Sequence, residues 1–226
     1  MGGPRPPSVL VMVRHCLHLM CIQLAWEFFY CVRKGQKSKH YIATPICWHR
    51  PNQGWFKLNS DEASQGNPGK ASGSGLICDH HGKWIKEYMR NIGNATSIAA
   101  AFWALRDGLM LAAQLGITQL LVELDAQVIV NLVQSKKPIN SSYSPLLNDY
   151  RYLLGQFHCI KIIHIFREAN RCADNLARVG YSLLGNFVVL DSPPTDELCT
   201  LLNLDAAGLY SLRLSTITSP FMANYF

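Results

Sequence analysis

The chain has 226 residues, of which 49% are hydrophobic and 16% are charged. This length and composition fit one globular domain with extensions, and they exclude a wholly disordered or collagen-like chain. The formal net charge of +6 is confined to residues 1–50, which hold seven basic residues and one acidic residue, so residues 51–226 are balanced. The basic surface of a whole nucleic-acid-binding domain is therefore not expected.

Residues 1–50 form a basic and partly apolar extension that ends in a linker. Residues 8–32 are mostly apolar, but Arg14 and Glu27 leave an uncharged stretch of only 12 residues between them, whereas a membrane-spanning helix needs about 20. No small-residue cleavage site follows, so we expect neither a secretory signal nor a membrane anchor. The segment is instead typical of a packed helix or a poorly ordered leader, and the polar residues 33–40 are typical of a linker.

The eight cysteines are irregularly spaced and include no Cys-x-x-Cys pair. Disulfide-stapled secreted folds have denser cysteines in shorter chains, so we expect free thiols in a reducing, intracellular compartment, either nucleus or cytoplasm. Cys16, His18 and Cys21 are a conceivable zinc site, but their spacing is poor for one.

From Trp55 onward, short segments with the side-chain periodicities of strands and helices follow one another. A glycine-rich turn over residues 66–75 follows the first strand, and the next two strands meet in a hairpin turn at residues 79–83. Thr96 or Ser97 can cap the first helix. The predicted elements in chain order are strands at 55–60, before 79 and after 83, a helix at 97–115, a strand at 117–125, helices at 126–135 and 144–157, a strand at 159–166 and a helix at 170–181.

This order predicts an α/β fold, in which an antiparallel meander of three strands is followed by parallel strands. The result is a five-stranded mixed sheet with helices on both faces. We predict three segments: an extension over residues 1–50, the domain over residues 51–184, and a tail over residues 185–226 that can pack a helix at 196–204.

Three aspartates lie at the ends of predicted strands or at the start of a predicted helix. Asp61 ends the first strand, Asp125 ends the apolar strand, and Asp174 lies in the first turns of the last helix. Ligands of open α/β sheets collect at the carboxyl ends of strands, and carboxylates that converge there repel one another unless a cation lies between them. Each aspartate alone is most simply a turn or cap residue, but the three together indicate a metal site.

Three segments resemble the motifs of ribonuclease H type 1 domains. NSDEASQGNPGKASGSG resembles the first-strand motif, VELDAQVIVN the second acidic motif, and HIFREANRCADNLARVG the closing motif. The resemblance covers about residues 55–181 and is greatest to the ribonuclease H-like domains of plant retroelement-derived, reverse-transcriptase-like proteins. It implies a ribonuclease H-like fold.

The resemblance also implies an activity, namely divalent-metal-dependent hydrolysis of the RNA strand of an RNA–DNA hybrid. The catalytic and metal-binding residues would be Asp61, Asp125 and Asp174, with two Mg²⁺ or Mn²⁺ ions. Ser64, Asn67 and Gln127 would contact the substrate in its minor groove, which suits recognition by shape and 2′-hydroxyl groups. Arg167 and Arg171 either touch phosphates or are solvated charges at the helix end.

Two positions depart from the family pattern. The fourth metal-binding carboxylate, a glutamate in the first long helix, corresponds to Ala101, and the glycine after the first aspartate is replaced by Glu62. Neighbouring residues of a strand point to opposite faces, so we expect Glu62 to point away from Asp61. Glu123 shares a face with Asp125 but lies one pleat back from the strand end. The histidine that some relatives carry before the last helix is also missing.

The departures leave two hypotheses for function. The first is an active ribonuclease of the hybrid-cleaving type. The second is a catalytically weakened or inactive nucleic-acid-binding remnant of a retroelement polyprotein, since a methyl group at position 101 cannot bind a metal.

Overall fold

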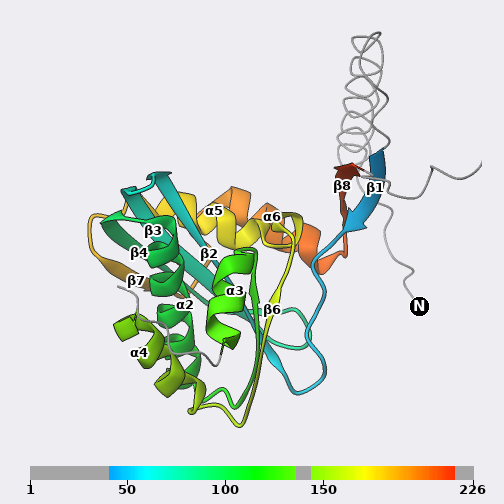
Figure 1. The fold of residues 1–226 in the computed structure, drawn as a ribbon. Coiled ribbons are helices and arrows are strands. Elements are labelled where there is room, and N and C mark those ends of the chain that lie inside the picture. Colours follow the sequence, from blue (N-terminus) through cyan, green and yellow to red (C-terminus); the bar gives the residue numbers. More distant parts are fainter. Residues whose placement is uncertain (1–40, 136–143, 217–226) are drawn as a thin grey trace, which may run out of the picture. The chain divides into compact units, whose positions relative to one another are not determined.

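The computed structural model describes residues 41–135 and 144–216 (Figure 1). The apolar segment 8–32, the linker 33–40 and the cysteine–histidine group at residues 16–21 lie outside the described residues. Within the described part of the chain, no helix is long and apolar enough to cross a membrane. Residues 43–214 form one compact unit.

A six-stranded mixed sheet with the order β6-β5-β2-β3-β4-β7 is the centre of this unit. The antiparallel meander and the parallel pairings of β2 with β5 and of β5 with β6 confirm the predicted fold class. The strands are β2 (Phe56–Gly66), β3 (Gly69–Cys78), β4 (Trp84–Ala95), β5 (Gln119–Leu124), β6 (Cys159–His164) and β7 (Phe187–Leu190).

The sixth strand, β7, was not predicted from the sequence. It pairs antiparallel with β4 over Glu87–Arg90, and it has only four residues, too few to establish an alternating pattern. The sequence prediction of five strands is therefore one strand short, although the predicted arrangement of the other five is confirmed.

The glycine-rich stretch after β2 is strand rather than the predicted turn. The chain reverses only at Asn67–Pro68, and β3 begins at Gly69. A Cβ atom on Gly73 would lie 2.8 Å from the Cβ of Ala104, and one on Gly75 would lie 2.6 Å from the Tyr88 hydroxyl. These glycines therefore allow a helix and a tyrosine to pack closely against the strand, which is a known use of glycine in sheets.

Helices cover both faces of the sheet, as predicted (Figure 1). On one face lies α2 (Ser97–Gln114), whose N-cap Thr96 accepts a hydrogen bond from the Ala99 amide at 3.2 Å, with α3 (Gln127–Gln134) and α4 (Ser144–Leu154) beside it. On the other face lies α5 (Arg171–Gly180), preceded by the short 3₁₀ helix η1 (Arg167–Ala169). The hydroxyl groups of Ser72 and Ser74 donate to α5 carbonyls, which fixes that helix on the sheet.

Each face has its own apolar core. Leu58, Tyr88 and Leu105 belong to the core beneath α2, and all three are fully buried. Leu76 and Leu176 belong to the core beneath α5, which Leu198 of α6 (Asp196–Ala206) completes. Side chains of successive strand residues alternate between the two cores, because the period of a strand is two.

The segment after residue 184 contains more structure than the sequence indicated. The possible helix at residues 196–204 is present as α6, which packs against α5. Arg171 of α5 forms an ion pair of 2.7 Å with Asp205. A separate two-stranded sheet pairs β1 (Tyr41–Ile46) with β8 (Ser211–Thr216). The boundaries predicted for extension, domain and tail stay predictions.

Leu58 tests the importance of the core beneath α2, because its side chain is fully buried there. Leu58→Ala should lower the free energy of unfolding by about 2–5 kcal/mol through lost burial and a residual cavity. Leu184→Ala is the matched control, because Leu184 is fully exposed, and it should change stability by less than about 0.5 kcal/mol. Urea unfolding followed by circular dichroism measures both, and equal effects would contradict the assignment of the core.

Candidate active site

The parallel pairing of β2 with β5 brings Asp61 and Asp125 together. Ser60 is the register partner of Leu124, so the residue after each of them lies at the same edge of the sheet. Asp61 is still in β2 and is 6% exposed, whereas Asp125 follows the last residue of β5 and is half-buried. The prediction that Asp61 ends its strand is wrong, because β2 continues to Gly66. Two carboxylates from distant parts of the sequence meet at the carboxyl end of β5, beside the middle of β2, and ligands of such sheets bind at the carboxyl ends of strands.

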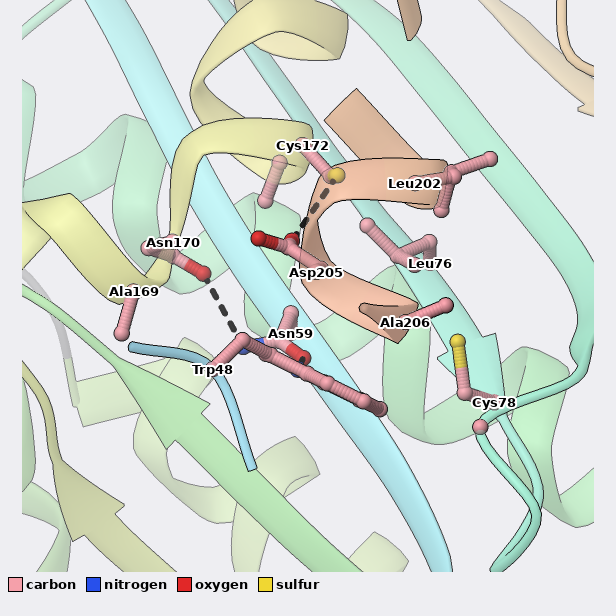
Figure 2. Close-up of a pocket in the computed structure, with 12 residues that line it drawn as sticks. Trp48, Asn59, Leu76, Cys78, Ala169, Asn170, Cys172, Leu202, Asp205 and Ala206 are labelled. Carbon is pink, nitrogen blue, oxygen red and sulfur yellow. Dashed lines mark hydrogen bonds between the residues drawn. The ribbon is translucent and has the colours of Figure 1, made fainter. Parts of the chain in front are cut away.

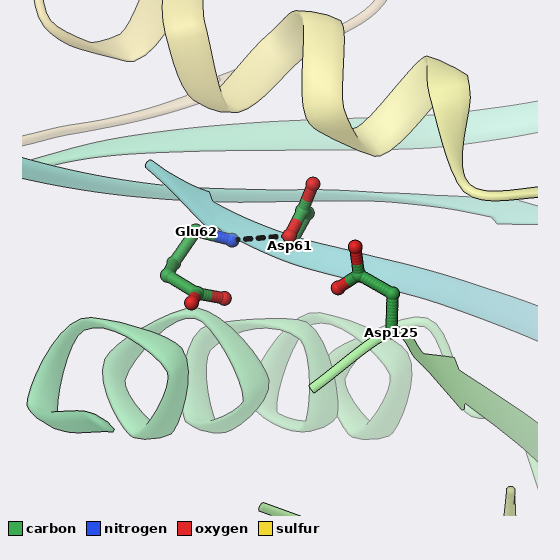
Figure 3. Close-up of side chains that lie close together, drawn as sticks. All are labelled: Asp61, Glu62 and Asp125. Carbon is green, nitrogen blue, oxygen red and sulfur yellow. Dashed lines mark hydrogen bonds between the residues drawn. The ribbon is translucent and has the colours of Figure 1, made fainter. Parts of the chain in front are cut away.

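Glu62 joins these two aspartates, contrary to our expectation. Carboxylate oxygens of Asp61, Glu62 and Asp125 all lie within 4.8 Å of one another. Figure 3 shows that the Glu62 side chain leaves β2 on the side of α2 and then turns back toward Asp125. The alternation rule is right for the direction of its Cβ atom but wrong for its carboxylate, because a glutamate side chain is long enough to return to the edge of the sheet.

Asp174 does not belong to this three-residue cluster. It lies in the first turn of α5, where it forms ion pairs with Arg167 and, at 2.9 Å, with Arg178. Its negative charge is close enough to raise the pKa of Asp61. The structure therefore places Asp174 near the cluster, with both carboxylate oxygens held by arginines.

The three carboxyl groups of the cluster are at least partly buried and close together, and both conditions disfavour the ionisation of Asp61 and Glu62. Burial raises the pKa of Asp61 well above its usual range, and the neighbouring charge of Asp125 raises it further. Burial and the charge of Asp125 also raise the pKa of Glu62 to about 7. No basic side chain among the described residues forms an ion pair with Asp61, Glu62 or Asp125. The charge of Arg167, which is paired with Asp174, lowers the pKa of Glu62 and offsets only part of their mutual repulsion.

Glu123 is not available as a substitute ligand. Its Oε1 accepts a hydrogen bond of 2.5 Å from the buried Lys57 ammonium, and its Oε2 accepts one of 3.0 Å from Asn59. Ala101, where the resemblance predicts a glutamate, is buried in the core beneath α2. Neither position supplies a free carboxylate to the edge of the sheet.

A buried polar network lies directly beneath the site and sets the position of α5. Asn59 accepts a hydrogen bond from the Trp48 indole at 2.8 Å and donates to Asn170 at 3.2 Å, while Asn170 donates to the Ser60 carbonyl at 3.1 Å. Figure 2 shows Trp48, Asn59 and Asn170 lining a small pocket between β2 and the start of α5. Asn170 comes just before α5, so this network fixes the helix that carries Asp174. No pattern in the sequence indicated a role for Asn59 or Asn170.

The three predicted substrate contacts lie in three different elements of the fold. Ser64 is half-buried near the end of β2, Asn67 is exposed in the turn after it, and Gln127 is exposed at the start of α3. Asn67 accepts a hydrogen bond from the Ser97 amide at 3.2 Å, and Gln127 donates to Asn131 at 2.9 Å. Arg171, a candidate phosphate contact, is instead paired with Asp205.

Comparison with known structures identifies the fold as that of ribonuclease H. The N-terminal ribonuclease H domain of a Mycobacterium tuberculosis protein matches with a TM-score of 0.54 and 27% identity, over 56% of this chain and 93% of that domain. Ribonuclease H1 from Halobacterium salinarum matches with a TM-score of 0.53 and 28% identity, over 56% of this chain and 96% of that one.

Residues 59–180 match the family model described as reverse transcriptase-like, and the chain belongs to this family. An Arabidopsis thaliana protein that carries the name "Putative ribonuclease H protein" is 35% identical over 72% of this chain. The chain spans only 26% of that protein, and 40% of a Mycobacterium tuberculosis protein described as bifunctional that is 28% identical.

The raised pKa of Glu62 predicts how stability depends on pH. The folded state keeps this proton up to about pH 7, whereas the unfolded chain loses it near its ordinary pKa of about 4.3. Between these values the folded state binds more protons, so this residue makes the free energy of unfolding fall as pH rises. Glu62→Gln should therefore gain stability relative to the wild type between pH 5 and pH 8.

Thermal unfolding in EDTA at both pH values measures this difference. Glu197→Gln removes the same charge from an exposed position of α6 and controls for the change in net charge. A stability difference between Glu62→Gln and wild type that stays constant with pH would contradict the electrostatic description of the cluster.

Proposed function

We propose that this chain is a divalent-metal-dependent ribonuclease domain that hydrolyses the RNA strand of an RNA–DNA hybrid. The observation that carries the proposal is the convergence of Asp61, in the middle of β2, and Asp125, at the carboxyl end of β5. These carboxylates form no ion pair with a basic side chain of the described residues, and such a buried group of like charges is stable when a cation neutralises it. Membership of the reverse transcriptase-like family and the ribonuclease H fold support the choice of substrate.

The donor set fits Mg²⁺ or Mn²⁺. The cluster of Asp61, Glu62 and Asp125 offers carboxylate oxygens, which hard divalent cations prefer, and Mg²⁺ commonly binds through one or two carboxylates plus water and phosphate oxygens. We assign Asp61, Asp125 and Asp174 as the residues that hold the metal, up to two ions. Bound there, divalent cations supply the positive charge that favours attack of water on a phosphodiester.

Asp174 can bind the metal only if it gives up its ion pair with Arg167. Arg167 is mostly exposed, so its ion pair with Asp174 is weak and easily given up. Release of Arg167 would free one carboxylate oxygen toward the cluster and leave a guanidinium at the rim of the site. A guanidinium at that place suits a phosphate of the nucleic acid.

The nucleic acid would lie across the edge that carries Ser64, Asn67 and Gln127. Their side chains are short polar groups, two of them exposed, and they suit contacts to 2′-hydroxyl and sugar oxygens better than contacts to base edges. The described domain is not a strongly basic surface, so recognition would rest on shape and on the metal.

Cleavage of an end-labelled RNA–DNA hybrid in Mg²⁺ or Mn²⁺ tests the proposal. Wild-type protein should cleave the RNA strand, and Asp61→Asn should lower the rate by about a hundredfold or more, since loss of a metal ligand removes several kcal/mol of barrier lowering. Asp191→Asn is the matched control, because its side chain is 83% exposed. Binding of the hybrid without cleavage above the Asp61→Asn level would favour the alternative, a nucleic-acid-binding remnant.

Gln127 provides a test of the binding surface apart from the metal. Gln127→Ala should weaken hybrid binding several-fold, because a net hydrogen bond contributes about 1 kcal/mol, without change in thermal stability. Gln114→Ala at the exposed end of α2 is the control. Fluorescence anisotropy in EDTA measures both affinities, and equal binding by the two variants would remove Gln127 from the interface.

A further inference from the structure

Glu62 has no role in the function proposed above, yet it is placed where a metal ligand would be. The register of β2 with β3 defines the face from which it starts. Asp61 pairs with Ser74, whose hydroxyl donates to Ala173 of α5, whereas Glu62 pairs with Gly73, which packs against Ala104 of α2. Glu62 therefore leaves the sheet on the α2 face, and Asp61 leaves it on the α5 face.

The α2 helix itself offers no oxygen ligand at this level. Ala101 lies one turn before Ala104 and so on the same face of the helix, and it presents a methyl group that is 7% exposed. The α2 side of the cluster thus has a single carboxylate, and it comes from the strand.

The Glu62 carboxylate lies within reach of a shared ion. Its oxygen is within 4.8 Å of the nearest oxygens of Asp61 and Asp125, and two oxygens on opposite sides of one Mg²⁺ are about 4 Å apart. The carboxylate oxygens therefore need to approach one another only slightly to share one ion. Asp61 is 6% exposed, and its hydrogen bond from the Glu62 amide at 2.9 Å fixes the two residues relative to each other.

We propose that Glu62 is a metal ligand of this site and supplies from β2 the carboxylate that α2 lacks at Ala101. This inference rests on the proposed metal site but not on the proposed substrate. The cation would be bound by Asp61 from the α5 face, Glu62 from the α2 face and Asp125 from the end of β5. It gives a physical reason for an acidic residue at a place where a second negative charge beside Asp61 would otherwise only repel.

Direct binding of Mn²⁺ to the full chain, followed by electron paramagnetic resonance of the free ion, tests the proposal without an activity assay. Glu62→Gln should weaken Mn²⁺ binding at least about tenfold, as should Asp61→Asn. Glu197→Gln, which removes one exposed charge on α6, should bind like wild type. Melting temperatures in EDTA verify that each variant is folded.

A compensating variant sharpens the test. If Glu62 takes the place of a helix ligand, Ala101→Glu in the Glu62→Gln background should recover most of the lost affinity. The same substitution in wild type should give less gain, because the α2 side then holds two carboxylates. Wild-type affinity in Glu62→Gln would overturn the proposal, and so would a failure of wild type to bind Mn²⁺.

The outcomes separate this inference from the proposed function. If Mn²⁺ affinity depends on Glu62 but wild type cleaves no hybrid, Glu62 is a metal ligand and the proposed nuclease function is wrong. If wild type cleaves the hybrid and Glu62→Gln binds Mn²⁺ as tightly as wild type, the proposed nuclease is supported and Glu62 is not a metal ligand.

Discussion

The repulsion among the carboxylates that meet where β5 ends beside Asp61 of β2 is the interaction on which the site depends. Parallel pairing makes it unavoidable, because the register that buries Leu58 and Val122 in one core also puts Asp61 beside Asp125. A cation is the simplest means of balancing such charge, since the affinity for it grows with the same repulsion that destabilises the empty cluster. The proposed metal binding would in this sense be a consequence of the topology.

The rigidity of the site comes from the polar network beneath it. Lys57 and Glu123 are almost fully buried and paired, and removing one partner of such a pair is strongly destabilising. Asn59 connects this ion pair to Asn170 and thereby to the first turn of α5. Buried hydrogen bonds therefore hold the part of β2 and the start of α5 that lie beside the acidic cluster.

Most of the fold could be predicted from the sequence, because periodicity and turn residues are local signals. The helix at 97–115 and the strand at 117–125 agree with α2 and β5 to within a few residues. The prediction of a turn over residues 66–75 was wrong, because Gly73 and Gly75 allow close packing against α2 and Tyr88. Only the tertiary structure reveals this use of glycine. β7 is too short to show a pattern, and its pairing partner β4 is about 100 residues earlier in the chain.

In the site, too, some features follow from local sequence signals and others depend on the tertiary structure. The position of Asp125 follows from the end of its strand, which the sequence marks. Asp61 lies inside β2 and meets Asp125 through the register of the two strands. The inclusion of Glu62 and the arginine partners of Asp174 depend on side-chain length and on which rotamer reaches a neighbour. The alternation rule gives the direction of a Cβ atom, and a long side chain can reverse what that direction implies.

β7 extends the sheet and α6 packs against α5. The region matched by the family model is therefore smaller than the compact unit. A fragment that stops at residue 180 or 184 would leave the backbone of β4 unpaired along Glu87–Arg90. It would also uncover the apolar surface that Leu198 seals and leave Arg171 without Asp205. An open strand edge beside exposed apolar surface is a template for aggregation. The limits of the family match alone would thus direct an experimenter to a fragment with an open strand edge.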